Sequence, residues 1–404
     1  MKVQRKEYLD WLKNWREKQL IKVVTGVRRC GKSTLFELYI DYLKKTGVEE
    51  NQIIFINLED VENENLLDYK SLYNYIISRL RKDNKYTYVF IDEVQQCKNF
   101  EKAVDSLFLK KYADVYITGS NAYMLSGELA TLLSGRYVEI QMLPLSFSEY
   151  YEFTNPEKNN IKTAFNNYLK YGSFPYVASL IQDNINIKGY IDGIYNTIIV
   201  KDVAIREGIT DIAVLENIVK FLCSSIGSPI SIKKISDTIN SSGRKISVNT
   251  VERYIRALCD SYIFYKADRY DIKGKQILKT LGKYYIVDTG LRDLLISSSS
   301  KDIGHLLENI VYLELLRRGY KVNIGKLNEK EIDFIVKNSD GIEYYQVAAT
   351  VLDSNTLDRE LEPLQKIADN YPKYLLTLDD FMNGANYNGI KQINILDWLL
   401  KKKQ

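Results

Sequence analysis

The sequence predicts an α/β protein of several domains. Within the first 146 residues, short apolar runs typical of buried strands alternate with helical patterns, and a glycine-rich segment follows the first run. Helical patterns dominate from residue 147 until a hairpin pattern near residues 262–287, and further strand patterns follow residue 301. A chain of 404 residues can form two to four domains, each with its own core. We expect domains at 1–146, 147–210, 211–295 and 301–404.

The first element is a strand, a tight loop and a helix. The apolar run Leu20–Thr25 precedes the octapeptide Gly26–Ser33, whose spacing is that of a P-loop, and the helical pattern Ser33–Leu38 follows. In this context, the backbone N–H groups of the loop can surround a polyphosphate, and the dipole of the helix favours its negative charge. The sequence therefore predicts binding of a nucleoside triphosphate.

Each residue type in the P-loop suits a task in phosphate binding. Gly26 and Gly31 let the main chain approach phosphate oxygens without a Cβ in the way. Lys32 is expected to reach the β- and γ-phosphates, and the Ser33 hydroxyl is expected to bind Mg²⁺. Thr34 is a candidate neighbour of the α-phosphate.

The next informative strand is Tyr88–Ile91, which ends at two carboxylates. Downstream of a P-loop, this is the Walker B pattern. Asp92 is expected to hold magnesium through water, and Glu93 to orient the attacking water for transfer of the γ-phosphoryl group.

A third strand, Val115–Thr118, leads to Ser120 and Asn121 at the carboxyl edge of the sheet, where ligands of open α/β folds bind. Either side chain could sense the γ-phosphate. An ordinary cap of the next helix is the alternative, and the residues alone leave both open.

Several segments together indicate a family. The chain resembles the prokaryotic ATPases of the AAA superfamily that carry a C-terminal nuclease-like domain of unknown function, on the segments Gly26–Ser33, Ile91–Gln95, Thr118–Ser120, Gly135–Arg136 and Leu143–Tyr150. The resemblance implies ATP as the nucleotide, a sensor at Ser120 or Asn121, and Arg136 as an arginine finger.

The arginine residues of this part have alternative roles. Arg136 would act in trans, on the nucleotide of a neighbouring subunit in a homo-oligomer, because a guanidinium neutralises charge on the transferred phosphoryl group. A surface arginine before the strand Tyr137–Ile140 is the alternative. Arg28 and Arg29 raise the positive potential at the P-loop, and Arg29 is a candidate ligand of the nucleotide; both could instead pair with acidic residues.

Residues 147–210 resemble the helical lid of this family, and residues 211–295 have the order of a winged helix, with three short helices and a basic hairpin. In the third helix, Ser247–Leu258, helical spacing predicts a buried face and a polar stripe. The buried face would hold Val248, Val251, Ile255 and Leu258, and the stripe would hold Asn249, Arg253 and Arg256. The stripe could contact double-stranded DNA. A role in lid or subunit contacts stays open.

The last segment follows a polar linker, Ser297–Ser300. Glu308 on its first helix and Asp333 on a strand resemble the metal-binding carboxylates of restriction-endonuclease-like folds. The second strand carboxylate is replaced by Gln346, and the lysine by Ala348. We therefore expect this fold without nuclease activity, although Lys330, Lys337 or Lys366 could substitute for the lysine.

Composition excludes several other classes of protein. Only one histidine, His305, is present, which excludes multi-histidine metal sites and disfavours a histidine-based triad. The four cysteines lie far apart, without the spacing of a zinc site. No apolar run is long enough to span a bilayer and no signal peptide is evident, so we expect a cytoplasmic protein without a membrane partner. The net charge of +4 does not by itself call for nucleic acid.

The expected protein is an Mg²⁺-dependent ATPase whose nucleotide state controls its conformation. Action on DNA, an assembly or signalling scaffold without DNA binding, and a nuclease effector are three alternatives for its wider role, and the residues at 346 and 348 disfavour the third.

Overall fold

The computed structural model describes residues 3–122, 133–155, 160–182, 187–241, 243–296, 302–338, 341–381 and 383–401. The predicted linker Ser297–Ser300 lies outside these ranges. The chain forms two compact units. The first contains Met1–Pro144 and Asp260–Tyr262, and the second contains Leu145–Cys259 and Ile263–Gln404.

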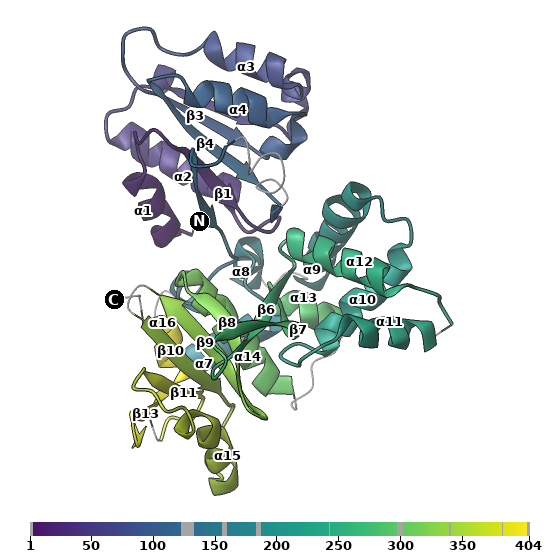
Figure 1. Ribbon diagram of the computed structural model, residues 1–404. Helices are drawn as coiled ribbons and strands as arrows, with labels where there is room; N and C mark the ends of the chain where they lie inside the picture. The colour runs from purple at the N-terminus through teal and green to yellow at the C-terminus, as the bar shows by residue number, and fades with distance from the viewer. Residues whose placement is uncertain are drawn as a thin grey trace. The chain divides into compact units, whose positions relative to one another are not determined.

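A parallel sheet of five strands forms the centre of the first unit (Figure 1), in the order β2-β3-β4-β1-β5. Its strands are β1 (Ile21–Thr25), β2 (Ile53–Asn57), β3 (Thr87–Asp92), β4 (Ala113–Gly119) and β5 (Tyr137–Gln141). The strands β1, β3, β4 and β5 confirm the predicted ones to within two residues at each end. Because all five are parallel, the residues that follow β1, β3 and β4 meet at one carboxyl edge.

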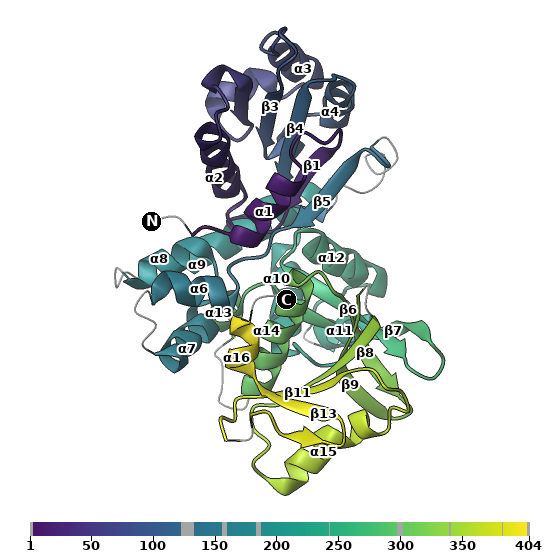
Figure 2. The ribbon, with the colours of Figure 1, turned by 90° about the vertical axis from the view of Figure 1, so that its left-hand side faces the viewer.

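Helices cover both faces of this sheet (Figure 2). They are α1 (Lys6–Asn14), α2 (Lys32–Lys45), α3 (Tyr69–Ile77) and α4 (Phe100–Phe108), with short 3₁₀ segments at Glu50–Gln52, Val61–Leu66 and Val94–Gln96. On the α2 face, the ring of Phe90 lies 5.1 Å from Phe36 and 4.7 Å from Tyr116. On the other face, aliphatic residues of α3 and α4 pack against alternate residues of β1, β3 and β4. Such burial is the main source of stability for the unit.

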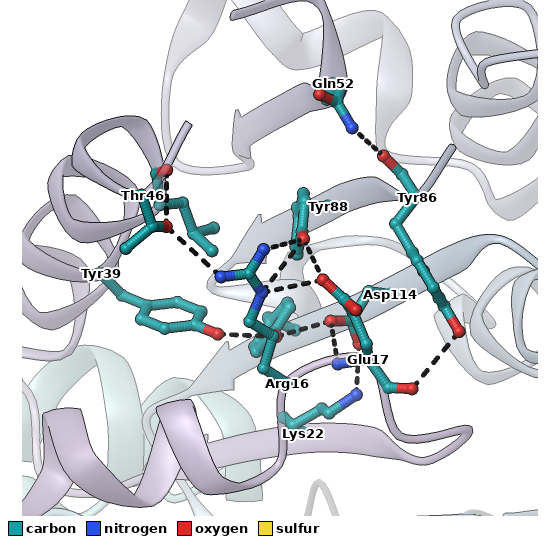
Figure 3. Close-up of polar contacts among 11 residues, drawn as sticks. Arg16, Glu17, Lys22, Tyr39, Thr46, Gln52, Tyr86, Tyr88 and Asp114 are labelled. Carbon is teal, nitrogen blue, oxygen red and sulfur yellow. Dashed lines mark hydrogen bonds and ion pairs between the residues drawn. The ribbon is translucent and has the colours of Figure 1, made fainter. Parts of the chain in front are cut away.

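The amino edge of the sheet holds a buried polar network (Figure 3). The Lys22 ammonium pairs with the Asp114 carboxylate, and both side chains are fully buried. Asp114 also accepts hydrogen bonds from the Tyr116 hydroxyl at 2.7 Å and the Glu17 amide at 2.8 Å, and the Lys22 ammonium donates to the Lys18 carbonyl at 2.7 Å. A buried ion pair is tolerated only when its remaining donors and acceptors are satisfied, as they are here.

Helices make up the first part of the second unit. They are α6 (Phe147–Thr154), α7 (Ile161–Tyr171), α8 (Pro175–Gln182), α9 (Ile187–Thr197), a π-helical segment (Ile198–Ile205), α10 (Ile212–Ser224), α11 (Ile232–Ser241) and α12 (Val248–Asp260). The predicted faces of α12 are confirmed except at one position. Val251, Ile255 and Leu258 are buried, and Arg253 is exposed, but Val248 is 41% exposed because it starts the helix and has no core beneath it.

An eight-stranded sheet forms the rest of the second unit, in the order β12-β13-β11-β10-β9-β8-β6-β7. Its strands are β6 (Phe264–Asp271), β7 (Gln276–Ile286), β8 (Lys321–Leu327), β9 (Lys330–Asn338), β10 (Gly341–Val347), β11 (Lys373–Thr377), β12 (Asn386–Tyr387) and β13 (Ile390–Asn394). Its helices are α13 (Thr289–Leu295), α14 (Ile303–Arg317), α15 (Ser354–Gln365) and α16 (Ile395–Leu400). In Figure 2 the strands run between α14 and α15.

The predicted wing hairpin belongs to this sheet. Strand β6 pairs in parallel with β8, with Arg269 beside Ile324, so one sheet joins strands that we assigned to two domains, 211–295 and 301–404. The sequence could not predict this pairing, because the two strands are far apart along the chain and each has ordinary strand patterning.

Candidate nucleotide-binding site

The P-loop lies between β1 and α2, and its backbone requires glycine at both ends. Gly26 has φ +146°, and a Cβ at this position would lie 2.2 Å from the carbonyl oxygen of Met142. Gly31 has φ +104° and immediately precedes the first turn of α2. The free N–H groups of that turn point toward the loop, which makes the position suitable for an anion.

Lys32 is 4% exposed and is bound to the loop itself. Its ammonium donates to the carbonyl of Gly26 at 3.0 Å and of Val27 at 3.4 Å, and lies 3.4 Å from the Glu93 carboxylate. Burial acts to lower the pKa of Lys32, but the carboxylates of Glu93 and Asp92 raise it above its usual value. The charged amine is thus held where a phosphate could replace its contacts.

Asp92 ends β3, and its carboxylate has one free oxygen. The Thr118 hydroxyl donates to Oδ1, while Oδ2 is buried and has no hydrogen-bond partner among the described residues. Burial raises the pKa of Asp92, and the nearby hydroxyl groups of Ser33 and Thr118 oppose this shift. A buried carboxylate oxygen without a partner is costly unless a cation or water completes it.

Glu93 follows in the left-handed conformation, with φ 51°. Its amide donates to the Thr118 hydroxyl at 2.9 Å, and its carboxylate accepts from Gln95 Nε2 at 2.5 Å. Burial acts to raise the pKa of Glu93, but Lys32, Gln95 and Arg28 lower it below its usual value. Glu93 is therefore an ionised base at neutral pH, oriented by two neighbours.

The structure places the other predicted nucleotide-site residues around this centre or at its rim. Ser33 and Thr34 lie in the first turn of α2, and both are half-buried. Ser120 and Asn121 are buried after β4, where the Ser120 hydroxyl accepts from Gln95 Nε2 at 3.2 Å. Arg29 lies in the loop with φ 69° and an exposed side chain.

Arg28 and Arg136 lie in different surroundings. Arg28 is mostly buried and pairs with Glu59, which follows β2, at 2.7 Å; pairing with an acidic residue was one of the two predicted alternatives. Arg136 precedes β5, whose first residue lies beside Ile21 at the start of β1. It therefore lies at the amino edge of the sheet, about 16 Å from the P-loop at 3.3 Å per residue of β1.

Within its own chain, Arg136 is held by α4. Its guanidinium pairs with Asp105 and lies 5.4 Å from the centre of the Phe108 ring. Both contacts keep the guanidinium beside α4 rather than at the P-loop of the same chain.

The sequence did not predict the residues outside the P-loop that hold it in place by hydrogen bonds. Arg5 is 3% exposed and donates to the carbonyls of Cys30 at 2.9 Å and Leu143 at 2.6 Å. The Tyr8 hydroxyl accepts from the Leu143 amide at 3.1 Å. Nothing in the local pattern marks an arginine that binds carbonyls 25 and 138 residues away. Thr118 and Gln95 lay inside quoted motifs, but their hydrogen-bonding roles were not predicted.

The site fits a nucleotide with Mg²⁺. The unpartnered Oδ2 of Asp92 and the adjacent Ser33 hydroxyl are oxygen groups of the kind that bind hydrated magnesium. The glycine cradle and the N-terminus of α2 suit a polyphosphate, and the Lys32 amine supplies a matching charge.

A second group of predicted residues meets in the other unit. Glu308 accepts hydrogen bonds from the Lys283 ammonium at 2.8 Å and the Tyr285 hydroxyl at 2.5 Å, and Asp333 accepts from the Val347 amide at 2.9 Å. Gln346 accepts from the Asp333 amide at 3.3 Å. These groups satisfy one another, as expected if they are structural.

The three lysines proposed as substitutes lie elsewhere. Lys330 and Lys366 both bind Glu362, at 2.8 Å and 2.6 Å, and Lys337 stacks on Tyr270 at 4.1 Å from the ring centre. Lys283, which we expected in a basic wing open to phosphates, is instead buried and reaches the cluster from β7.

This geometry is that of a P-loop nucleotide-binding site, and comparison with known proteins agrees. Residues 18–151 match the family model described as an AAA domain, and residues 162–302 match a domain of unknown function. The chain is 39% identical to an uncharacterized protein of Haemophilus influenzae over 99% of both chains. It is 32% identical to an uncharacterized protein of Methanocaldococcus jannaschii, over 89% of this chain and 82% of that protein. The chain belongs to the family that these proteins form.

Solved structures with a similar fold include a Walker-type ATPase of Pyrococcus abyssi, with TM-score 0.46, 14% identity, and coverage of 72% of this chain and 95% of that one. Another is Cdc6p of Pyrobaculum aerophilum, with TM-score 0.33, 10% identity, and coverage of 76% and 94%. Similarity at this level says nothing about function. Within the described ranges, no helix combines the length and the apolar character needed to cross a membrane.

The P-loop backbone leaves no space for a side chain at Gly26. Gly26→Ala is expected to abolish nucleotide binding, because the new Cβ would lie 2.2 Å from the Met142 carbonyl oxygen and would displace the loop. Gly47→Ala is the matched control, since Gly47 has φ +93° but no atom within 4 Å of the added Cβ. The control should lose about 1–2 kcal/mol of stability from backbone strain and still bind. Titration calorimetry with Mg-ATP would show this, and equal affinity of the two variants would contradict it.

Proposed function

We propose that the protein is an Mg²⁺-dependent ATPase of AAA type whose nucleotide state switches its conformation. The observation that carries this proposal is the convergence of the P-loop, the Lys32 amine and the Asp92–Glu93 pair at one edge of the sheet. Lys32 would neutralise the β- and γ-phosphates, and Ser33 and Asp92 would hold Mg²⁺ with its water. When bound, Mg²⁺ supplies charge neutralisation of the phosphates.

The remaining residues have proposed roles in the same reaction. Glu93, ionised and oriented by Gln95, would accept a proton from the attacking water or position it. Ser120 or Asn121 would respond to the γ-phosphate, because Ser120 already shares the Gln95 amide with Glu93. Arg29 would contact the nucleotide from the exposed side of the loop, and Thr34 would lie near the α-phosphate. The choice of ATP over GTP rests on the family resemblance.

Two substitutions separate binding from chemistry. Lys32→Ala is expected to abolish both Mg-ATP binding and hydrolysis, because it removes the buried charge. Glu93→Gln is expected to keep binding while lowering kcat about 10²- to 10⁴-fold, because an amide cannot accept the proton of water. Phosphate release and calorimetry measure the two effects. Normal turnover by Glu93→Gln would show that another group activates the water.

We further propose that Arg136 acts in trans, on the nucleotide of a second copy in a homo-oligomer. Its position at the amino edge of the sheet, away from the P-loop of its own chain, supports a role toward a neighbouring copy. Its pairing with Asp105 would hold the guanidinium until assembly, when phosphate oxygens compete for it.

Mixing of inactive variants tests this role. Arg136→Ala is expected to lower hydrolysis about 10³-fold or more while Mg-ATP binding stays intact. Mixed with Lys32→Ala, which keeps Arg136, it should regain part of the activity, because one mixed interface combines an intact P-loop with an intact finger. Asp105→Asn is the control that frees the guanidinium without removing it. If the mixture stays inactive, or if Arg136→Ala alone hydrolyses ATP normally, the role in trans is wrong.

We propose a winged-helix role for α10–α12 and the β6–β7 hairpin, with double-stranded DNA as the partner. The exposed side of α12 carries Asn249, Arg253 and Arg256, and basic side chains nearby are also exposed: Lys233, Lys234, Arg244 and Lys245. Positive charges gathered on adjacent helices suit a phosphate backbone. We assign residues 147–210 to a helical lid and residues 301–404 to a nuclease-like fold without nuclease activity.

A double variant distinguishes this partner from a DNA-free scaffold. Arg253→Ala with Arg256→Ala is expected to weaken DNA binding and to reduce the dependence of log affinity on log salt by about 2, one for each lost phosphate contact. Lys45→Ala with Lys188→Ala, on α2 and α9, is the charge-matched control, because both side chains are exposed and lie outside the proposed winged helix. Fluorescence anisotropy over a salt series measures both. If the wild-type chain self-associates with ATP but does not bind DNA, the scaffold alternative is favoured.

A further inference from the structure

One lysine of the second unit lies at the centre of a group of carboxylates. Lys283 of β7 is 2% exposed. Its ammonium lies 2.8 Å from Glu308 of α14, 2.7 Å from Glu331 of β9 and 3.9 Å from Asp333 of β9. Three acidic side chains from two elements thus surround a single positive charge supplied by a third element.

The electrostatics of this group favour a positive charge at its centre. Burial alone would lower the pKa of Lys283, but Glu308, Asp333 and Glu331 raise it above its usual value, so the amine stays charged. Burial also acts to raise the pKa of Glu308, but Lys283 and hydrogen bonds lower it. For Asp333, burial and the Glu308 charge raise the pKa far above its usual range. The ammonium thus lowers the pKa of Glu308 and opposes the rise in the pKa of Asp333.

The arrangement has the features of a hard-cation site with one difference. Carboxylate oxygens from separate elements converge on one point, as they do around Mg²⁺, Mn²⁺ or Ca²⁺. The distances from that point to Glu308 and Glu331 match N–H···O contacts rather than metal bonds, and the distance to Asp333 is longer. Accordingly, among the residues that the structure describes, no three acidic, histidine or cysteine side chains are grouped to hold a metal.

A route for a hydrated ion is also present. A cavity of ≈ 410 Å³ is lined by Glu308, Asp333 and Gln346 among others, and it lies beside the ammonium without Lys283 in its lining. An ion that entered this cavity would meet two of the three carboxylates directly.

We propose that the Lys283 ammonium occupies the position of a divalent cation among Glu308, Glu331 and Asp333. The second unit therefore needs no metal at this cluster, and removal of the amine creates a site for a hard divalent ion. The ammonium supplies one positive charge and N–H donors at hydrogen-bonding distance from Glu308 and Glu331, and it acts on Asp333 by charge alone. A divalent ion at the same point would supply two charges and would draw the oxygens closer.

The test is a melting experiment on the full chain without nucleotide. In chelator, Lys283→Met is expected to melt at a lower temperature than the wild type. In millimolar Mn²⁺ its Tm should rise by about 2 °C or more beyond any rise of the wild type. Electron paramagnetic resonance of Mn²⁺ should detect one bound ion more in Lys283→Met than in the wild type. The wild type serves as the baseline for any ion held by Asp92.

Two double variants test the carboxylates around Lys283. Lys283→Met with Glu308→Gln should lose the response to Mn²⁺, because one ligand is neutralised. If Lys283→Met folds only when Mn²⁺ is present, the proposal is supported. If it folds in neither condition, Lys283→Met with Glu331→Gln carries less buried charge and should fold and still bind Mn²⁺. A folded variant without the extra ion, or a wild type that binds the same ion, would overturn the proposal.

Discussion

The nucleotide site depends on the close approach between the start of the P-loop and the segment after β5. The Met142 amide donates to the Thr25 carbonyl at 2.7 Å, and its own carbonyl leaves no space for a side chain at Gly26. Arg5 joins the same segment to the end of the loop by binding two carbonyls. Both ends of the loop are thereby fixed by the protein, so a polyphosphate does not have to order them, and this preorganisation favours binding.

Buried charge serves different purposes at the two edges of the five-stranded sheet. At the amino edge, the Lys22–Asp114 pair is completed by the Tyr116 hydroxyl and backbone groups (Figure 3). At the carboxyl edge, Asp92 keeps a buried oxygen without a partner. A network whose donors and acceptors are all paired stabilises the fold but offers no group to a ligand. A network with an unpaired buried oxygen is stabilised when a ligand or ion binds that oxygen. A cation or water at the carboxyl edge would complete this network.

The sequence predicted those features that local spacing determines. The strands β1, β3 and β4, the P-loop and the carboxylates after β3 follow from apolar runs and glycine spacing within short segments. The segment Leu143–Tyr150 has a local basis too, because Ser146 and Glu149 form a reciprocal cap for α6. Such signals need no knowledge of the rest of the chain.

Contacts between distant segments could not be predicted in this way. Arg5, Gln95 and Lys283 are ordinary surface residue types by pattern, and only the assembled fold buries them or turns them toward a carboxylate. The expected lysine substitutes failed for the same reason, since proximity in sequence to Asp333 does not determine which amine reaches it. Val248 was misassigned because helical periodicity does not indicate where the core ends.

The shared sheet limits how a nucleotide-driven switch can work. Because β6 is hydrogen-bonded to β8, the hairpin that we assign to the winged helix cannot move against the C-terminal strands without breaking that pairing. The contacts of Lys283 with Glu308 and Glu331 add a second, buried connection between the same parts, and separating them would leave charges unpaired at a cost of about 3–5 kcal/mol. A conformational change that preserves these bonds must carry the hairpin and the eight-stranded sheet together. The basic stripe on α12 comes shortly before the hairpin in the chain, because α12 ends at Asp260 and β6 begins at Phe264. A partner bound to α12 is therefore linked through the chain to the eight-stranded sheet rather than to a separate winged helix.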